Sequence, residues 1–168
     1  LKSVINSDKK LKIGISCGDI NGIGPEVIIK TLNHPELLNL CIPIIYGPSK
    51  AFSYYKKILQ VPYFNFFQIE TIQEAEEGRI NLINTYQKDF SVEAGHVTSV
   101  AGDISFYSLE AVMSDLIEKK IDGLVTAPIN KQNIRRKEFP YAGHTDYIAQ
   151  KANTKENLMM MVSEDLKV

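Results

Sequence analysis

Apolar and polar positions follow two patterns along this chain, and the patterns alternate. Short, nearly continuous apolar runs predict β-strands at residues 11–16, 41–46, 64–69, 80–86, 121–126 and 158–162. Between them, segments with helical spacing predict helices at residues 25–32, 49–59, 104–120, 131–137 and 146–152. This alternation is typical of an α/β layered fold, α/β/α, with a largely parallel sheet. No repeat or interdomain linker interrupts it, so we expect residues 1–168 to form one unit without an internal boundary.

Proline, glycine and capping residues define the ends of some of these elements. Pro25 fixes the backbone of a first helical turn, and Asp103 is a suitable N-cap for the longest predicted helix. Residues 74–79, with the sequence EAEEGR, fit either a turn or a short helix that precedes the strand at 80–86.

The composition favours a small-molecule ligand over a macromolecule. The chain has 168 residues, 44% of them hydrophobic, which is enough to bury a core. Its 19 basic and 20 acidic residues leave a net charge of -1 without long like-charge blocks, which argues against a nucleic acid or a membrane surface as partner. Cys17 and Cys41 have no disulfide or zinc spacing, and no apolar run approaches the ~20 residues of a membrane span. We therefore expect a cytoplasmic protein.

The loop after the first predicted strand, GDINGIGPE at residues 18–26, is a candidate ligand loop. It contains Gly-x-Gly but lacks the last glycine of a dinucleotide motif and the Gly-Lys-Ser/Thr of a phosphate-binding P-loop. Its glycines permit close approach to a ligand, whereas Asp19 and Glu26 disfavour a bare phosphate. The loop would better suit a hydroxyl-rich or amino-bearing substrate. A tight strand-to-helix turn without a ligand explains the same pattern, and the spacing does not separate the two interpretations.

Two further loops carry residues suited to an anion. Lys131, at the end of VTAPINK, combines a cation with the free amides of a predicted helix start. In GHTD, His144 and the Thr145 hydroxyl could bind a phosphate or carboxylate, although Thr145 or Asp146 could equally cap the next helix. We expect the other basic groups of interest to be solvent-exposed: Arg135, Arg136, Lys137, His34 and His96. No histidine pair has metal-ligand spacing, and no nucleophile-histidine arrangement is present.

Four segments, taken in order, resemble the 4-hydroxythreonine-4-phosphate dehydrogenase family of pyridoxal phosphate (vitamin B6, pyridoxine) biosynthesis. They are GDINGIGPE, GHVTSVAGDISFYSLEA at 95–111, VTAPINKQNI at 125–134 and AGHTDYIA at 142–149. The resemblance implies an oxidoreductase that uses NAD to oxidise 4-phosphooxy-L-threonine, with decarboxylation to 3-amino-1-hydroxyacetone phosphate. A divalent metal (zinc, magnesium or cobalt) would polarise the substrate hydroxyl. The resemblance also implies a fold similar to that of isocitrate and isopropylmalate dehydrogenases, and a homodimer.

The resemblance implies roles for individual residues. The family's His-Thr pair, which binds the phosphorylated substrate, falls on His144 and Thr145. Weaker candidates for the same cleft are Asp19, Asn21 and Lys131. The match assigns no catalytic, cofactor-binding or metal-binding residue within this chain.

Departures from the family pattern leave the substrate open. The first loop has Asp-Ile-Asn where Asp-Pro is usual, Ala127 replaces a common glycine, and Asn130 replaces a common histidine. One alternative is therefore a sister dehydrogenase for phosphorylated threonate-like or erythronate-like acids. Two others are a phosphate acetyltransferase-like transferase, which would need neither NAD nor metal histidines, and a non-catalytic phosphate-binding module.

The last residues fit an N-terminal portion of a longer dehydrogenase. Residues 163–165 predict a turn, and residues 166–168 have the pattern of a strand that begins there. Family members continue well beyond the position equivalent to Val168, and the resemblance places their metal-binding histidines and cofactor site in that part. We expect the first such histidine within about ten residues of Val168, the length needed to finish a strand and enter its loop.

Overall fold

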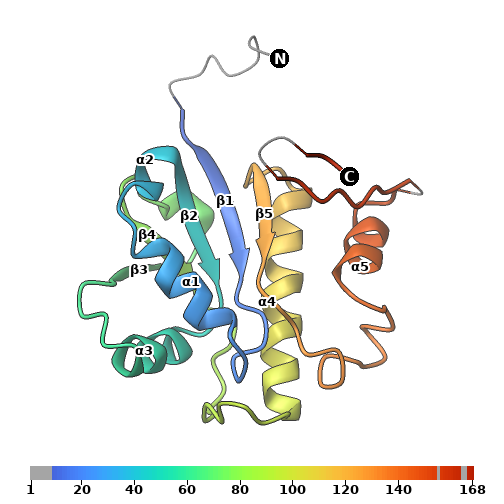
Figure 1. Cartoon of the computed structure of the whole chain (residues 1–168), viewed down its shortest axis with the longest axis horizontal. Helices are drawn as coiled ribbons and strands as arrows, with labels where there is room; N and C mark the ends of the chain where they lie inside the picture. The colour runs from blue at the N-terminus through green and yellow to red at the C-terminus, as the bar shows by residue number, and fades with distance from the viewer. Residues whose placement is uncertain (1–8, 155, 164–165) are drawn as a thin grey trace.

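A parallel sheet forms the centre of the structure. The computed structural model describes residues 9–154, 156–163 and 166–168. Within these ranges the sheet has five strands, β1 (Leu11–Ser16), β2 (Cys41–Tyr46), β3 (Phe66–Ile69), β4 (Ile80–Ile83) and β5 (Gly123–Thr126), in the order β3-β4-β2-β1-β5 (Figure 1). Every pairing between neighbouring strands of this sheet is parallel. The predicted α/β class is therefore confirmed.

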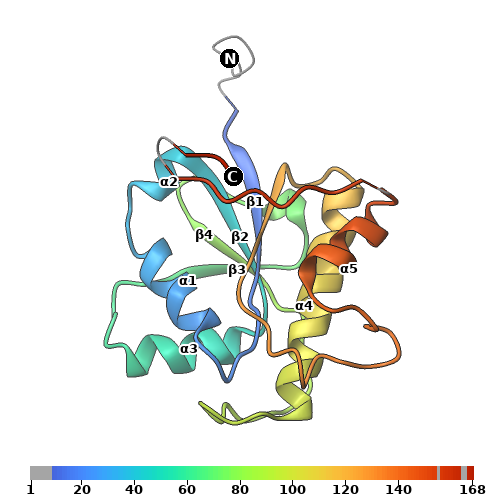
Figure 2. The ribbon, with the colours of Figure 1, turned by 45° about the vertical axis from the view of Figure 1, so that its right-hand side comes forward.

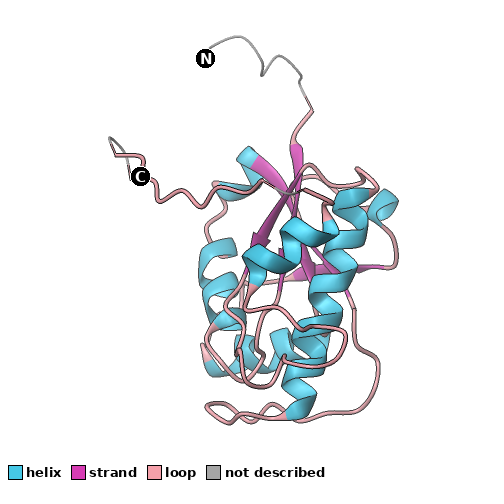
Figure 3. Cartoon of the chain, turned by 90° about the vertical axis from the view of Figure 1, so that its right-hand side faces the viewer, coloured by secondary structure: helices cyan, strands magenta, loops and turns pink. Residues whose placement is uncertain are grey.

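Helices cover both faces of the sheet (Figure 3). They are α1 (Gly24–Leu32), α2 (Leu37–Leu40), α3 (Ser49–Ile58), α4 (Ser99–Ile117) and α5 (His144–Lys151), with a 3-10 turn at Ile72–Glu74. Successive side chains of β2 point to opposite faces: Ile45 joins the hydrophobic core under α1 and α3, whereas Ile44 and Tyr46 join the one under α4. Helix α5 lies alongside α4 (Figure 2).

Helix α4 packs very closely against β1, which lies between β2 and β5 in the sheet. A Cβ atom added to Gly14 of β1 would lie 2.5 Å from Cγ2 of Val112 and 2.6 Å from Cδ1 of Ile121. At these separations any larger residue at position 14 would overlap Val112 and Ile121 and force their side chains to shift. The absence of a side chain lets the α4 side chains rest directly on the strand backbone.

A buried serine ties α4 to the carboxyl ends of two strands. The Ser108 hydroxyl donates to the Tyr46 carbonyl at 2.6 Å and accepts from the Cys17 amide at 2.9 Å. Ser108 is fully buried, and these bonds satisfy its hydroxyl inside the core. The helix is thereby held in register with the loops that follow β1 and β2.

The start of the longest helix was wrongly predicted. Asp103 is not its N-cap, because α4 begins at Ser99 and the Thr98 side chain accepts a hydrogen bond from the Ala101 amide at 3.2 Å. Asp103 instead forms an ion pair with Arg136 at 2.6 Å. Both residues can cap a helix by sequence, and the long-range ion pair gives Asp103 another partner.

Two predicted elements near the carboxyl end were also wrong. Residues 131–137 form turns rather than a helix, because the Asn130 side chain folds residues 131–133 locally and an isolated antiparallel bridge joins Arg136 to Phe139. Residues 158–162 are extended but exposed, and they pair with the last residues only through a Val162–Lys167 bridge instead of entering the sheet. Of the turn predicted at 163–165, residues 164 and 165 lie outside the described ranges.

The remaining predictions differ from the structure mainly at element ends. Three predicted strands are shorter than expected, because pairing covers only residues 66–69, 80–83 and 123–126. The short helix α2 was not predicted. At 74–79 the turn alternative is confirmed, because a turn at 77–79 follows the 3-10 helix Ile72–Glu74. These are shifts at boundaries, where sequence patterns carry the least information.

We expect Gly14→Ala to lower the free energy of unfolding by about 1–3 kcal/mol, as overpacking of a tight core contact does. Val112→Ala should destabilise alone by leaving a cavity, yet it should relieve part of the Gly14→Ala clash. Urea unfolding of both single variants and the double variant gives the coupling between the two positions. Strictly additive effects would contradict the close packing of α4 on β1.

Candidate functional site

The loops after β1 and β5 meet at the carboxyl end of the sheet. From β1 the chain turns to α1 on one face, whereas α4, on the opposite face, leads into β5. From the carboxyl end of β5 the chain continues to α5, on the same face as α4, so the connections that leave β1 and β5 lie on opposite sides of the sheet. In parallel sheets, ligands bind outside the carboxyl ends of such neighbouring strands. These loops are residues 17–23 and 127–134, at the end of β1 and β5 to which the strand arrows point in Figure 1.

The two loops touch through glycine. Gly18 has a φ of 64°, and a Cβ atom there would lie 2.3 Å from the Pro128 carbonyl oxygen. The Asp19 amide donates to that same oxygen at 2.9 Å. At Gly24 a Cβ atom would lie 2.5 Å from the Cys17 carbonyl oxygen. The glycines of GDINGIGPE thus allow close packing within this loop and against the loop after β5.

Asn21 braces a third loop against the first. Its side-chain Nδ2 donates to the His96 carbonyl and to the Thr98 hydroxyl, both at 3.0 Å, and its Oδ1 accepts from the Glu93 amide at 2.9 Å. The Gly95 amide donates to the Asn21 carbonyl at 2.8 Å. Because Asn21 is buried and both Nδ2 hydrogens are used, its side chain holds the 93–98 segment and the N-cap of α4 in place.

The side chains of Asp19 and Cys17 are also buried. Asp19 is 6% exposed, and its Oδ1 accepts from the Asn21 amide at 2.9 Å. Tyr55 of α3 steadies the same loop by donating to the Ile20 carbonyl at 2.8 Å. Burial raises the pKa of the Cys17 thiol to about 12, so it stays protonated at neutral pH and is unsuited to act as a nucleophile.

Lys131, on the loop after β5, lies close to His144, the first residue of α5. A Cβ atom on Gly143 would lie 3.7 Å from Lys131 Cε and 4.0 Å from its Nζ. Burial, and after it the charge of Lys131, lowers the pKa of His144, which is therefore neutral at neutral pH. Its Nε2 is buried and has no hydrogen-bond partner within the described part of the chain.

The helix that His144 begins has no side-chain cap. Gly143 is the N-cap of α5, and neither Thr145 nor Asp146 makes a capping hydrogen bond. Thr145 is exposed. The capping interpretation is therefore not supported, and the first amides of α5 stay available to a ligand beside Lys131 and His144.

Residues 139–151, which include the start of α5, are held against α4 by several contacts. Tyr147 donates to the Glu110 carboxylate at 2.6 Å, and Lys151 pairs with its other oxygen at 2.8 Å. Phe139 stacks on Tyr147 with ring centroids 5.2 Å apart and meets Phe106 edge-on. Both ends of α5 are thus positioned from α4.

The basic residues outside this pair take different roles. Arg135, Lys137, His34 and His96 are exposed, as predicted. Arg136 was expected to be solvated but is instead half-buried, paired with Asp103 and placed with its guanidinium carbon 4.9 Å from the Phe106 ring centroid. Sequence reasoning missed Gly102 and Ser108, because their contacts are made across the fold, and it noted Asn130 only as a departure from the family pattern, without its role in folding the turn.

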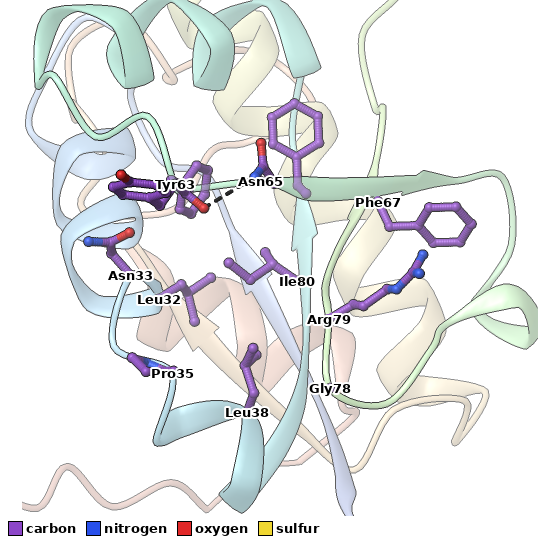
Figure 4. A pocket seen from close by; sticks show the side chains of 12 residues that line it. Leu32, Asn33, Pro35, Leu38, Tyr63, Asn65, Phe67, Gly78, Arg79 and Ile80 are labelled. Carbon is purple, nitrogen blue, oxygen red and sulfur yellow. Dashed lines mark hydrogen bonds between the residues drawn. The ribbon is translucent and has the colours of Figure 1, made fainter.

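A separate cavity lies at the other end of the sheet (Figure 4). It has a volume of about 470 Å³ and an apolar floor that includes Leu32, Phe64 and Ile80. The charged group at its rim, Arg79, pairs with Glu76 and lies over the Phe67 ring, so it is already engaged. None of the predicted site residues lines this cavity.

The described residues contain neither a cluster of metal-binding side chains nor a membrane-spanning helix. Among the described residues, no group of three or more His, Cys, Asp or Glu side chains could hold a metal ion. Over the same ranges, no helix has the length and apolar character required to cross a membrane. The family resemblance places the metal-binding histidines beyond the position of Val168.

Comparison with known proteins agrees with the motifs. The family described as "Pyridoxal phosphate biosynthetic protein PdxA" matches residues 39–168. The chain belongs to this family. A 4-hydroxythreonine-4-phosphate dehydrogenase from Bacteroides thetaiotaomicron is 40% identical over 162 residues, which are 96% of this chain and 44% of that protein. A D-threonate 4-phosphate dehydrogenase from Cupriavidus necator is 32% identical over 167 residues, 96% of this chain and 49% of that protein.

A solved structure of a family member has the same fold. The 4-hydroxythreonine-4-phosphate dehydrogenase from Burkholderia phymatum superposes with a TM-score of 0.83 at 29% identity, covering 95% of this chain and 49% of that one. The chain therefore spans about half the length of the relatives it matches, as expected for an N-terminal portion.

We expect Asn21→Ala to lower the free energy of unfolding by about 1–3 kcal/mol, because it leaves buried partners without their hydrogen bonds. Amide exchange at Glu93, whose N–H is bonded to Asn21, should accelerate beyond the global change. Asn65→Ala, which removes an exposed asparagine, is the matched control and should cost less than about 0.5 kcal/mol. Equal effects of the two substitutions would rule out the bracing role of Asn21.

Proposed function

We propose that this chain supplies the phosphate-binding part of the active site of an NAD-dependent 4-hydroxythreonine-4-phosphate dehydrogenase in pyridoxal phosphate biosynthesis. The observation that carries the proposal is the placement of Lys131 beside His144 at the uncapped start of α5. A lysine ammonium, an imidazole and free helix amides together suit a dianionic phosphate. The Thr145 hydroxyl, exposed on the same turn, would complete the set.

The reaction we propose is oxidation of 4-phosphooxy-L-threonine with decarboxylation to 3-amino-1-hydroxyacetone phosphate. The role of this chain is to bind the phosphate and hold the substrate in the crevice formed by the loops after β1 and β5. Asp19 and Asn21 shape that crevice mainly through the bonds they make to neighbouring loops. A zinc, magnesium or cobalt ion would polarise the substrate hydroxyl. We place its ligands and the NAD site in the part of the relatives that this chain does not span.

The relatives also support a second substrate. Both names found among them, 4-hydroxythreonine-4-phosphate and D-threonate 4-phosphate dehydrogenase, specify a 4-phosphate, so the same phosphate site would serve either. We favour the first because the Bacteroides thetaiotaomicron relative is 40% identical and the Cupriavidus necator relative 32%. Family membership favours both over a phosphate acetyltransferase-like transferase or a non-catalytic phosphate-binding module. The cytoplasmic location remains a prediction from the composition, and the homodimer remains a prediction from the resemblance.

The oxyanion site can be tested on the 168-residue chain with sulfate, whose charge does not change near neutral pH. A bound dianion favours the imidazolium form of His144 and so raises the pKa of His144. Sulfate should therefore bind more tightly as the pH falls below the ordinary histidine value of 6.5. Lys131→Met should weaken binding at pH ~8 about tenfold, the range of one charge-assisted hydrogen bond.

NMR titration of the His144 imidazole with sulfate provides this measurement. Lys137→Met removes an equally exposed lysine six positions along the same segment and should leave the affinity unchanged. An equal loss in both lysine variants would show a general charge effect and contradict a site at Lys131.

In the full-length parent protein, we expect His144→Ala to raise KM for the phosphorylated substrate or lower kcat/KM by about tenfold or more, with little change in KM for NAD. Steady-state kinetics with 4-phosphooxy-L-threonine and with D-threonate 4-phosphate, each ligand varied in turn, measure this and identify the substrate. Unchanged substrate dependence in His144→Ala would contradict the assignment.

The 168-residue chain alone should produce no NADH even with divalent metal.

A further inference from the structure

The turn that carries Lys131 is folded by the residue before it. The Asn130 side-chain Oδ1 accepts from the Gln132 amide at 2.9 Å and more weakly from the Asn133 amide at 3.4 Å. The Asn130 carbonyl accepts from the Ile134 amide at 3.2 Å. One asparagine thus closes the turn 130–134 with its side chain and its backbone, a common use of this residue type.

The same turn rests on the backbone of α4. A Cβ atom added to Gly102 would lie 2.0 Å from the Asn133 carbonyl oxygen and 2.5 Å from its carbonyl carbon. Both are backbone atoms, which cannot rotate away as the end of a side chain can. Ile134, at the end of the turn, is 1% exposed and anchors it in the core under α4. The turn can therefore sit at this height above α4 only because position 102 is glycine.

We infer that Gly102 and Asn130 are positioning residues that place Lys131 beside His144. This inference rests on the proposed function. Lys131 is exposed, and nothing but the length of its side chain limits where its ammonium can go. The ammonium therefore reaches the start of α5 only if the turn places the Lys131 Cα close enough. Gly102 sets the distance of the turn from α4, and Asn130 sets its shape. Neither residue touches the substrate.

The pKa of His144 reports how close Lys131 is, because the Lys131 charge is one of its two causes. The other charged groups of this region have partners of their own. Glu110 is held by Tyr147 and Lys151, and Asp103 by Arg136. Asp146, in the first turn of α5, is retained in every variant below. Burial of His144 is the larger cause of its lowered pKa, so a change in that pKa follows the position of Lys131 in variants that leave His144 equally buried.

The experiment is an NMR pH titration of His144 in the 168-residue chain, with four variants of the turn and its contact and a fifth, Val112→Ala, as control. Lys131→Met should raise the pKa of His144 by removing the nearby positive charge. Gly102→Ala and Asn130→Ala should raise it toward the Lys131→Met value and weaken sulfate binding about three- to tenfold. Asn130→Ser should restore the wild-type values, since its hydroxyl can accept the same amide bonds.

Val112→Ala separates positioning from general destabilisation. It weakens the same helix on the side facing the sheet, away from the turn, and should leave the pKa of His144 and the sulfate affinity unchanged. If Gly102→Ala does not fold, the comparison of Asn130→Ala with Asn130→Ser decides the matter. If Lys131→Met raises the pKa of His144 but Asn130→Ala leaves that pKa and the sulfate affinity at their wild-type values, the inference is overturned. Absence of sulfate binding to the wild-type chain would instead refute the proposed function.

Discussion

The rest of the structure depends on the close packing of α4 between the sheet and the segment that follows β5. On one side of the helix, Gly14 of β1 lets Val112 rest on the strand backbone. On another side, Gly102 of the helix itself lets the Asn133 carbonyl rest on the helix backbone. A side chain at position 14 would displace Val112, and one at position 102 would meet backbone atoms, so the two glycines keep the helix close to both neighbours. A well-packed core transmits such a constraint because it has little free volume to absorb a displacement.

This helix connects the segments that make up the candidate site. Its N-cap, Thr98, is bonded to Asn21 of the loop after β1. Farther along, Ser108 links it to the carboxyl ends of β1 and β2, and Glu110 holds α5 through Tyr147. The loop after β1, the turn with Lys131 and the start of α5 are therefore positioned by one element, although they are far apart in sequence. The proposed phosphate site is therefore preorganised by α4, and preorganisation reduces the entropy lost on binding.

The proposed site residues divide into two groups by their hydrogen bonds. The His144 Nε2 has no partner within the described ranges and Thr145 makes no capping bond, whereas Asp19 and Asn21 bond to neighbouring loops. The sequence ranked His144 and Thr145 above Asp19, Asn21 and Lys131 as candidates for one cleft. It could not show that Lys131 lies beside His144 while Asp19 and Asn21 bond to other loops, because those contacts join distant segments. Asn130 stood out only as a departure from the family pattern and Gly102 not at all, since their contacts appear only where the turn meets α4.

By itself, the sequence determined the alternation of strands and helices, the parallel sheet class, the family and the places where loops carry phosphate-binding residue types. These depend on local periodicity and on short motifs, which a chain carries without reference to its fold. Only the tertiary structure decided that Asp103 pairs with Arg136 instead of capping α4, that residues 131–137 turn instead of forming a helix, and that Lys131 meets His144. Apart from the local turn at Asn130, each of these outcomes depends on a partner elsewhere along the chain. Such contacts override local preference once the core has formed.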